Sequence, residues 1–184
     1  DCAAFVEAGV RAYPEVDEGD VVRLDGEVEL RRGELQVETE ARSALDSDER
    51  DAVERRLADA LAAKARPDAV ESLAGEPGVE AVTDQLADAA EAIRGAVLES
   101  RPIVVRHAAP AAGYVAGAAI ERAVLPLIRE EHARADAEYP FFTRRPLDDP
   151  VYGMNAATSD VTWMLQDSEL HGENLPLLVL VCTG

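Results

Sequence analysis

The chain has 184 residues, enough for one ordinary domain or two small ones. Its 37 acidic residues outnumber 18 lysines and arginines, and the net charge of −19 argues against nucleic-acid binding in dilute buffer, where affinity comes from counterion release. No signal peptide is visible, and no apolar run approaches the roughly 18 residues of a membrane helix. The composition therefore indicates a soluble, cytoplasmic protein without a membrane partner.

The acidic residues are spread through every segment, and Lys64 is the only lysine in the sequence. This balance resembles the salt-adapted proteins of extreme halophiles, an interpretation that we favour over a merely acidic protein from a GC-rich genome. At molar salt the screening length falls to about 3 Å, so that repulsion between carboxylates becomes tolerable. Counterion release is then weak for every protein, and the net charge no longer excludes nucleic-acid binding.

The two ends of the chain suggest a fragment of a longer protein. The sequence does not begin with Met, and it opens and closes inside apolar stretches that are typical of strands. Cys2 and Cys182 lie at opposite ends and match no metal or disulfide spacing, which indicates reduced thiols.

Residues 1–46 are expected to be mostly β. A strand fragment at 1–6 precedes a short helix at 7–13 that Pro14 ends. Residues 21–30 and 34–41 alternate apolar and polar and predict a hairpin around Arg31-Arg32-Gly33, with a bulge at Gly26. This order of elements, carried by GDVVRLDGEVELRRGELQV, resembles the second half of an OB-fold of the nucleic-acid-binding type.

The resemblance implies a partial OB-fold β-barrel, because the first two strands would precede Asp1. OB-folds bind single strands by stacking bases on aromatic side chains over a basic groove. The candidate nucleic-acid-binding residues are Phe5, Arg11, Tyr13, Arg23, Arg31 and Arg32. For each residue taken alone, we favour the competing interpretation of a core aromatic or a solvated arginine.

Residues 47–100 predict a helical connector between two domains. Ser47 is the expected N-cap of the first helix, and Pro67 should end or restart it. The Pro77-Gly78 pair breaks the pattern again, and residues 83–98 repeat an apolar helical stripe. No residue of this segment suggests chemistry.

Residues 101–184 alternate as an α/β unit should, and two fully apolar strands joined through helices imply a parallel sheet. Pro126 should kink or shorten the first helix, and Gly113-x-x-x-Gly117 on that helix indicates close packing rather than a phosphate loop. Residues 144–146 are expected in a loop. The expected elements are strand 102–106, helix 113–131, edge strand 138–143, helix 156–166 and strand 175–181.

The start of this unit carries a second resemblance, through RHAAPAAGY and the helix AGAAIERAVLPLI that follows. These segments resemble the beginning of the DHH phosphoesterase domain of RecJ-like single-strand exonucleases. An OB-like module and helices before that domain resemble the archaeal branch in particular. The resemblance implies a multi-domain α and β protein with a partial OB-fold (1–46), a connector (47–100) and the N-terminal part of a DHH domain (101–184).

The family's first motif, His-x-x-Asp-x-Asp-Gly, is degenerate here. His107 and Gly113 match it, whereas Pro110 and Ala112 stand in place of the aspartates. Cys182 stands where the second motif has an Asp. The third motif, Asp-His-His, should lie beyond Gly184 and is not in this chain. In the family, the Asp and His residues of these motifs hold two manganese ions that activate water.

The replacements predict that the site has lost its metals. Manganese and magnesium need several oxygen ligands, and a proline carbon or a thiolate cannot replace them. We therefore expect no catalytic residue and no cofactor in this chain, with manganese or magnesium bound only if a missing part rebuilds the site. His107 is then either a vestigial metal ligand or, as we favour, a loop histidine with a structural hydrogen bond.

Three hypotheses about function remain. We favour a RecJ-like protein of DNA replication or repair that binds single-stranded DNA or RNA, together with other proteins of those processes, and is catalytically impaired. The first alternative is an active metal-dependent single-strand exonuclease or phosphoesterase, a hydrolase. The second is a protein-interaction scaffold that does not bind nucleic acid.

Overall fold

The computed structural model divides the chain into two compact units, Asp1–Ala58 and Asp59–Gly184. The division lies inside helix α1 (Ser47–Ala65). The three-part organisation expected from the sequence stays a prediction. The structure describes residues 5–7, 10–11, 16, 19–31, 34–73, 75–133, 136–171 and 174–183.

The first described strands, β1 (Phe5–Glu7) and β2 (Val10–Arg11), form a short antiparallel pair. Phe5 lies opposite Arg11 in this pair. The helix expected at residues 7–13 is therefore wrong at Glu7, Val10 and Arg11, because their backbones are extended and bonded across the pair.

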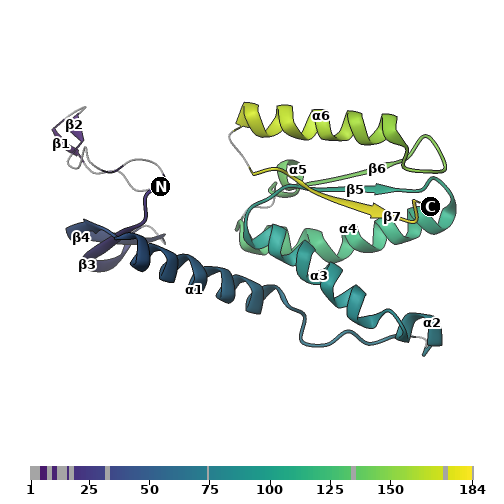
Figure 1. The fold of residues 1–184 in the computed structure, drawn as a ribbon, viewed down its shortest axis with the longest axis horizontal. Helices are drawn as coiled ribbons and strands as arrows, with labels where there is room; N and C mark the ends of the chain where they lie inside the picture. The colour runs from purple at the N-terminus through teal and green to yellow at the C-terminus, as the bar shows by residue number, and fades with distance from the viewer. Residues whose placement is uncertain are drawn as a thin grey trace. The chain divides into compact units, whose positions relative to one another are not determined.

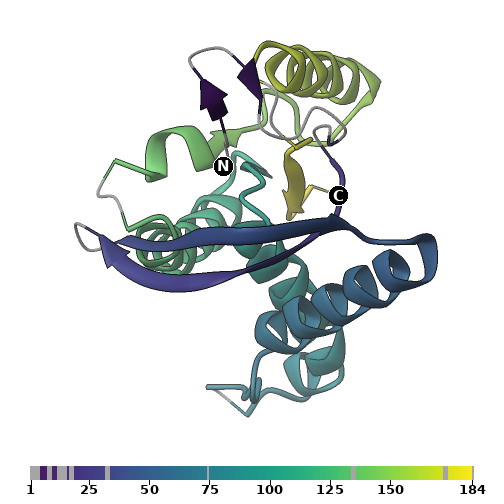
Figure 2. The same ribbon diagram turned by 90° about the vertical axis from the view of Figure 1, so that its left-hand side faces the viewer.

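A long hairpin follows, formed by β3 (Val22–Arg31) and β4 (Glu34–Ala44) (Figures 1 and 2). Its register shifts between Asp25 and Gly26, which confirms the predicted bulge. Within the described residues, the four strands of this unit make two separate two-stranded sheets. No closed barrel is present among them, so the expected OB-fold is not shown.

Helix α1 is capped at its N-terminus by Asp46, the residue before Ser47. The Glu49 amide donates to Asp46 Oδ1 at 2.8 Å, and the Arg50 amide donates to the Asp46 carbonyl at 2.9 Å. Asp46 is therefore the N-cap, and the assignment of this role to Ser47 was wrong. The helix ends at Ala65, two residues before Pro67, as expected.

The larger unit is a three-stranded parallel sheet between helices. Its strand order is β6-β5-β7, with β5 at Ile103–His107, β6 at Phe142–Pro146 and β7 at Leu177–Val181. Figure 1 shows α3 and α4 on one face of the sheet and α6 on the other. The helices of this unit after α1 are α2 (Pro77–Glu80), α3 (Thr83–Leu98), α4 (Ala111–Glu131), α5 (Glu138–Phe141) and α6 (Met154–His171).

The expected parallel sheet is confirmed, but one of its strands was misplaced. The structure has helix α5 over the first part of the expected edge strand, and β6 covers residues 144–146, which were expected in a loop. Pairing with β5 explains the difference, since Val105 lies opposite Arg144 and His107 opposite Pro146 in the parallel ladder. Long-range pairing thus overrides the polar character of these residues.

Helix α4 continues through Pro126 to Glu131, the expected end, so the proline does not shorten it, and the alternative of a kink stays a prediction. Val124 and Ile128, on either side of the proline, are buried in the core against the sheet. Among the described residues, α4 is the one helix long and apolar enough to cross a membrane by length and composition, contrary to the sequence-based expectation. Its contacts with β5, β6 and β7 are those of a core helix.

Two glycines one turn apart bring α4 close to the end of β5. A Cβ atom at Gly113 would lie 2.1 Å from the Ala108 carbonyl oxygen, and one at Gly117 would lie 2.9 Å from His107 Cδ2. The Gly-x-x-x-Gly spacing therefore serves close packing, as predicted.

We expect Gly113→Ala to lower the free energy of unfolding by about 2–3 kcal/mol, because the methyl group overlaps backbone that cannot move aside. Gly78→Ala is the matched control, since nothing lies within 4 Å of the added atom. Denaturant unfolding in concentrated salt measures both variants. Equal midpoints for the two would contradict the proposed packing.

Candidate functional site

The three parallel strands end together, and the segments that follow them meet at one edge of the sheet. His107 lies opposite Pro146 on one side and Val181 on the other. The Ala108 amide donates to the Val181 carbonyl at 3.1 Å, and the Leu147 amide donates to the His107 carbonyl at 2.8 Å. Ligands of open α/β sheets bind at this carboxyl edge.

His107 is the last residue of β5, not a loop residue as expected, and its side chain is fully buried (0% exposed). Its Nδ1 lies 2.9 Å from the Ala108 carbonyl oxygen. Because a carbonyl only accepts, Nδ1 carries the proton of this hydrogen bond. The ring also meets the Tyr114 ring edge-on, with 4.6 Å between the centroids.

Arg144 and Glu121 complete the surroundings of His107. Arg144 Nη1 lies 3.2 Å from His107 Nε2, and Arg144 Nε forms an ion pair with the Glu121 carboxylate. Sequence reasoning missed both residues. The spacing on α4 is a usable signal, because Glu121 lies one turn after Gly117, the glycine that faces His107.

The positions of the missing aspartates follow β5 and β7 at the same edge as His107. Pro110 is the N-cap residue of α4, and Ala112 lies exposed in its first turn. Cys182 directly follows β7 in a left-handed conformation, with φ of 54°. In the described part of the chain, no three His, Cys, Asp or Glu side chains are grouped to hold a metal ion.

A second polar cluster lies on the α6 side of the sheet. Arg106 Nε is 3.0 Å from Asp160 Oδ2, an ion-pair distance without hydrogen-bond geometry. The Tyr152 hydroxyl donates to the same oxygen at 3.1 Å. Arg145 lies over the ring of Trp163, 5.1 Å from its centroid. These contacts fix α6 to the sheet and pair the guanidinium of Arg106 with the Asp160 carboxylate.

The predicted nucleic-acid-binding residues all belong to the smaller unit. The backbones of Phe5 and Arg11 lie opposite each other in the β1–β2 pair, and Arg31 ends β3 opposite Glu34. Tyr13 and Arg32 lie outside the described residues. The structure therefore brings two of these residues together and tests none of the predicted roles.

Arg23, the remaining candidate, lies in β3 and forms an exposed ion pair with Glu49 at 2.9 Å. Both side chains are about half exposed. A phosphate group would have to compete with this carboxylate for the guanidinium.

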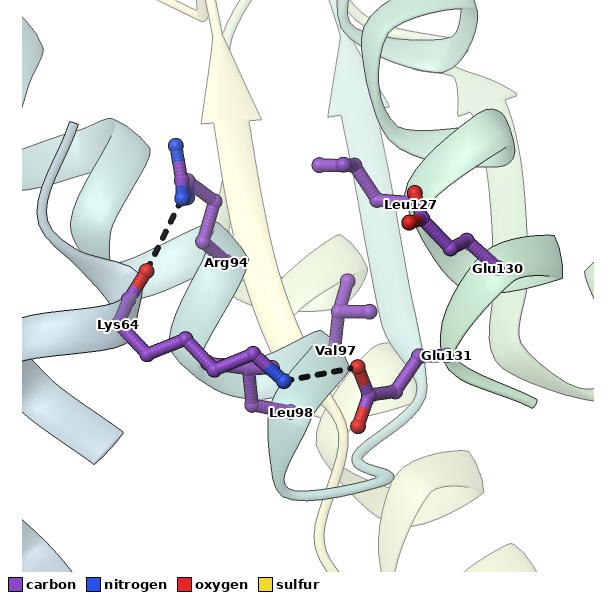
Figure 3. Close-up of a pocket in the computed structure, with 7 residues that line it drawn as sticks. All are labelled: Lys64, Arg94, Val97, Leu98, Leu127, Glu130 and Glu131. Atoms are coloured by element: carbon purple, nitrogen blue, oxygen red, sulfur yellow. Dashed lines mark hydrogen bonds and ion pairs between the residues drawn. The ribbon is translucent and has the colours of Figure 1, made fainter. Parts of the chain in front are cut away.

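A pocket of about 230 Å³ lies where the end of α1 meets α3 and α4 (Figure 3). Lys64 Nζ is 3.2 Å from Glu131 Oε2, and Arg94 donates to the Lys64 carbonyl at 2.9 Å. The charged groups that line the pocket mostly bind one another. The pocket's volume is also below the roughly 300 Å³ of common ligand sites. The lining residues are Lys64, Arg94, Val97, Leu98, Leu127, Glu130 and Glu131.

Other contacts at this joint hold the end of α1 in place. Arg66 Nη1 lies 2.7 Å from both Asp88 and Glu91 of α3, and these hydrogen bonds raise the pKa of its guanidinium further. A Cβ atom at Gly95 would lie 4.0 Å from Ala65 Cβ, which is ordinary packing. The pocket is therefore a structural joint rather than a candidate for chemistry.

Tyr152 should make the unfolding free energy fall at high pH. Burial and the nearby Asp160 carboxylate raise its pKa above the ordinary tyrosine value of about 10. The unfolded chain then loses this proton first, so stability is complete below about pH 10 and is lost as pH rises through the folded-state pKa.

We expect Tyr152→Phe to weaken the fall in unfolding free energy between about pH 9 and 11, as measured by denaturant titration. Tyr139→Phe is the control, because that side chain is exposed and should leave the wild-type slope unchanged. Parallel pH profiles for wild type and Tyr152→Phe would contradict the prediction.

No family model matches the chain. The uncharacterized protein MJ1198 of Methanocaldococcus jannaschii is 37% identical over 183 residues, which are 99% of this chain and 24% of that protein. The chain thus spans about a quarter of the length of this relative.

One solved structure is similar as well, described as a member of the s1p family of ribosomal proteins, PF0399 DHH domain. It shares 34% sequence identity with a TM-score of 0.68, over 73% of this chain and 31% of that one. The chain is thus similar in sequence and fold to a protein described as a DHH domain, and it shares a mixed α/β fold around a parallel sheet.

Proposed function

We propose that this chain is part of a RecJ-like DHH protein that binds single-stranded nucleic acid in replication or repair and is catalytically impaired. The observation that supports this most is the carboxyl edge of the sheet. His107 and Gly113 are retained there, while Pro110, Ala112 and Cys182 occupy the positions of the metal-binding aspartates.

The residues at this edge do not fit the family's pair of metal ions. Hard divalent cations take carboxylate, carbonyl and water oxygens, and an in-line displacement at phosphorus needs two of them close together. The side chains of Pro110 and Ala112 carry no ligand atom. Loss of phosphodiesterase activity is thus the expected result of the sequence changes.

Binding of a single strand is proposed for the smaller unit, through the basic and aromatic residues around its hairpins. The solved neighbour's description joins a DHH domain to a ribosomal-protein family. RNA is therefore as good a candidate as DNA. We place the protein in the cytoplasm, where the free thiol of Cys182 would stay reduced.

Fluorescence anisotropy of the full-length protein with labelled single-stranded DNA and RNA, at molar KCl, tests the binding. We expect Arg31→Ala/Arg32→Ala to weaken binding severalfold, because two cations beside the strand are lost. Arg50→Ala is the control, since Arg50 in α1 pairs with Glu54 at 2.8 Å. No binding of either strand by the wild type would leave the protein-scaffold alternative.

The enzyme alternative needs a separate experiment. A 5′-labelled single strand is incubated with the full-length protein, manganese and high salt, and we expect no shortening. Manganese titration by calorimetry should likewise show no tight binding of two ions. Processive shortening of the strand, or two tightly bound ions, would establish an active exonuclease instead.

A further inference from the structure

We infer that the guanidinium of Arg144 is the resident cation at the end of β5 and keeps metal ions away from His107. The inference rests on the proposed loss of the metal pair. It adds a second reason why His107 binds no metal ion, besides the missing aspartates. A histidine that kept its free nitrogen could still bind one ion. Here that nitrogen is already occupied.

The direction of the hydrogen bonds shows which nitrogen is involved. Nδ1 donates its proton to the Ala108 carbonyl at 2.9 Å, so Nε2 of the neutral ring carries the lone pair. Arg144 Nη1 lies 3.2 Å from Nε2, and a guanidinium can only donate. The one atom of His107 that could bind a metal ion therefore accepts a hydrogen bond from Arg144.

Arg144 is held in this position from its other side. Its Nε donates to Glu121 in an ion pair whose two side chains are only 26% and 33% exposed. Hydrogen bonds between charged groups are stronger than neutral ones, and partial burial reduces their screening by salt. Glu121 thus neutralises the guanidinium that lies against His107.

No room remains for a second cation beside the first. A metal ion bonded to Nε2 would lie about 2.0–2.1 Å from it, well inside the contact distance of Arg144 Nη1. The α4 backbone closes the remaining side, because the Cα of Gly117 approaches both residues: an added Cβ would lie 2.9 Å from His107 Cδ2 and 3.2 Å from Arg144 Cδ. A metal ion can enter only if Arg144 leaves.

The neighbouring arginine provides a matched control. Successive side chains of a strand point to opposite faces, and Arg145 lies over Trp163 of α6 while Arg144 pairs with Glu121 of α4. Arg144→Met and Arg145→Met remove the same charge from adjacent positions of β6. Only the first change exposes Nε2 of His107.

The test uses cobalt(II), a paramagnetic ion that imidazole binds well, and ring NMR signals of the 184-residue chain labelled in its three histidines. His107→Gln assigns the His107 signal. In Arg144→Met, we expect cobalt to broaden this signal at a concentration at least tenfold lower than in the wild type or in Arg145→Met. Equal broadening in all three proteins, or no gain in Arg144→Met, would overturn the inference.

A second measurement uses the wild type, with His107→Gln only to assign the signal. It therefore tests the inference even if Arg144→Met does not fold. The nitrogen shifts of His107 in the wild type should report a neutral ring with the proton on Nδ1. A proton on Nε2 would overturn the inference. The proposed loss of activity is tested separately. Manganese-dependent shortening of a nucleic-acid strand would contradict it, whatever the protonation of His107.

Discussion

The close approach of α4 to the end of β5 is the contact on which the candidate site depends. Any side chain at Gly113 would overlap the Ala108 carbonyl, and a side chain at Gly117 would press on His107. The same approach brings Glu121, one turn further along α4, within reach of Arg144. The positions of His107, Arg144 and Glu121 therefore depend on the close approach of two backbone segments, which only glycine at 113 and 117 permits.

Local patterns predicted those parts of the fold that local forces determine. Helix α3 begins and ends as its apolar stripe indicates, and the bulge at Gly26 follows from a glycine inside an alternating strand. The failures occur where distant segments pair. Two arginines and a proline in β6 are typical of a loop, yet bonding to β5 makes them a strand. A helical pattern at residues 7–13 likewise yields to the pairing of Phe5 with Arg11.

The residues of the candidate site likewise fall into those that a local motif predicted and those that depend on distant contacts. A short motif identified His107 and Gly113, because their spacing lies within one strand, loop and helix. The partners of Arg144 lie 23 and 37 residues away in the sequence, at Glu121 and His107. No periodicity in one sequence connects positions so far apart. The residues that give a buried histidine its environment were therefore beyond sequence reasoning, even where the histidine was found.

The central place of β5 also determines when the sheet can form. Ile103 pairs with Phe142 on one side and with Leu177 on the other, and both partners come much later in the chain. During synthesis, this apolar strand stays unpaired until β6 has emerged, and its other side stays unpaired until β7 near the end of the chain follows. Contacts between distant segments slow folding and leave intermediates prone to aggregation. The early pairing of α3 with α4, which are closer in sequence, would cover one face of β5 during that interval.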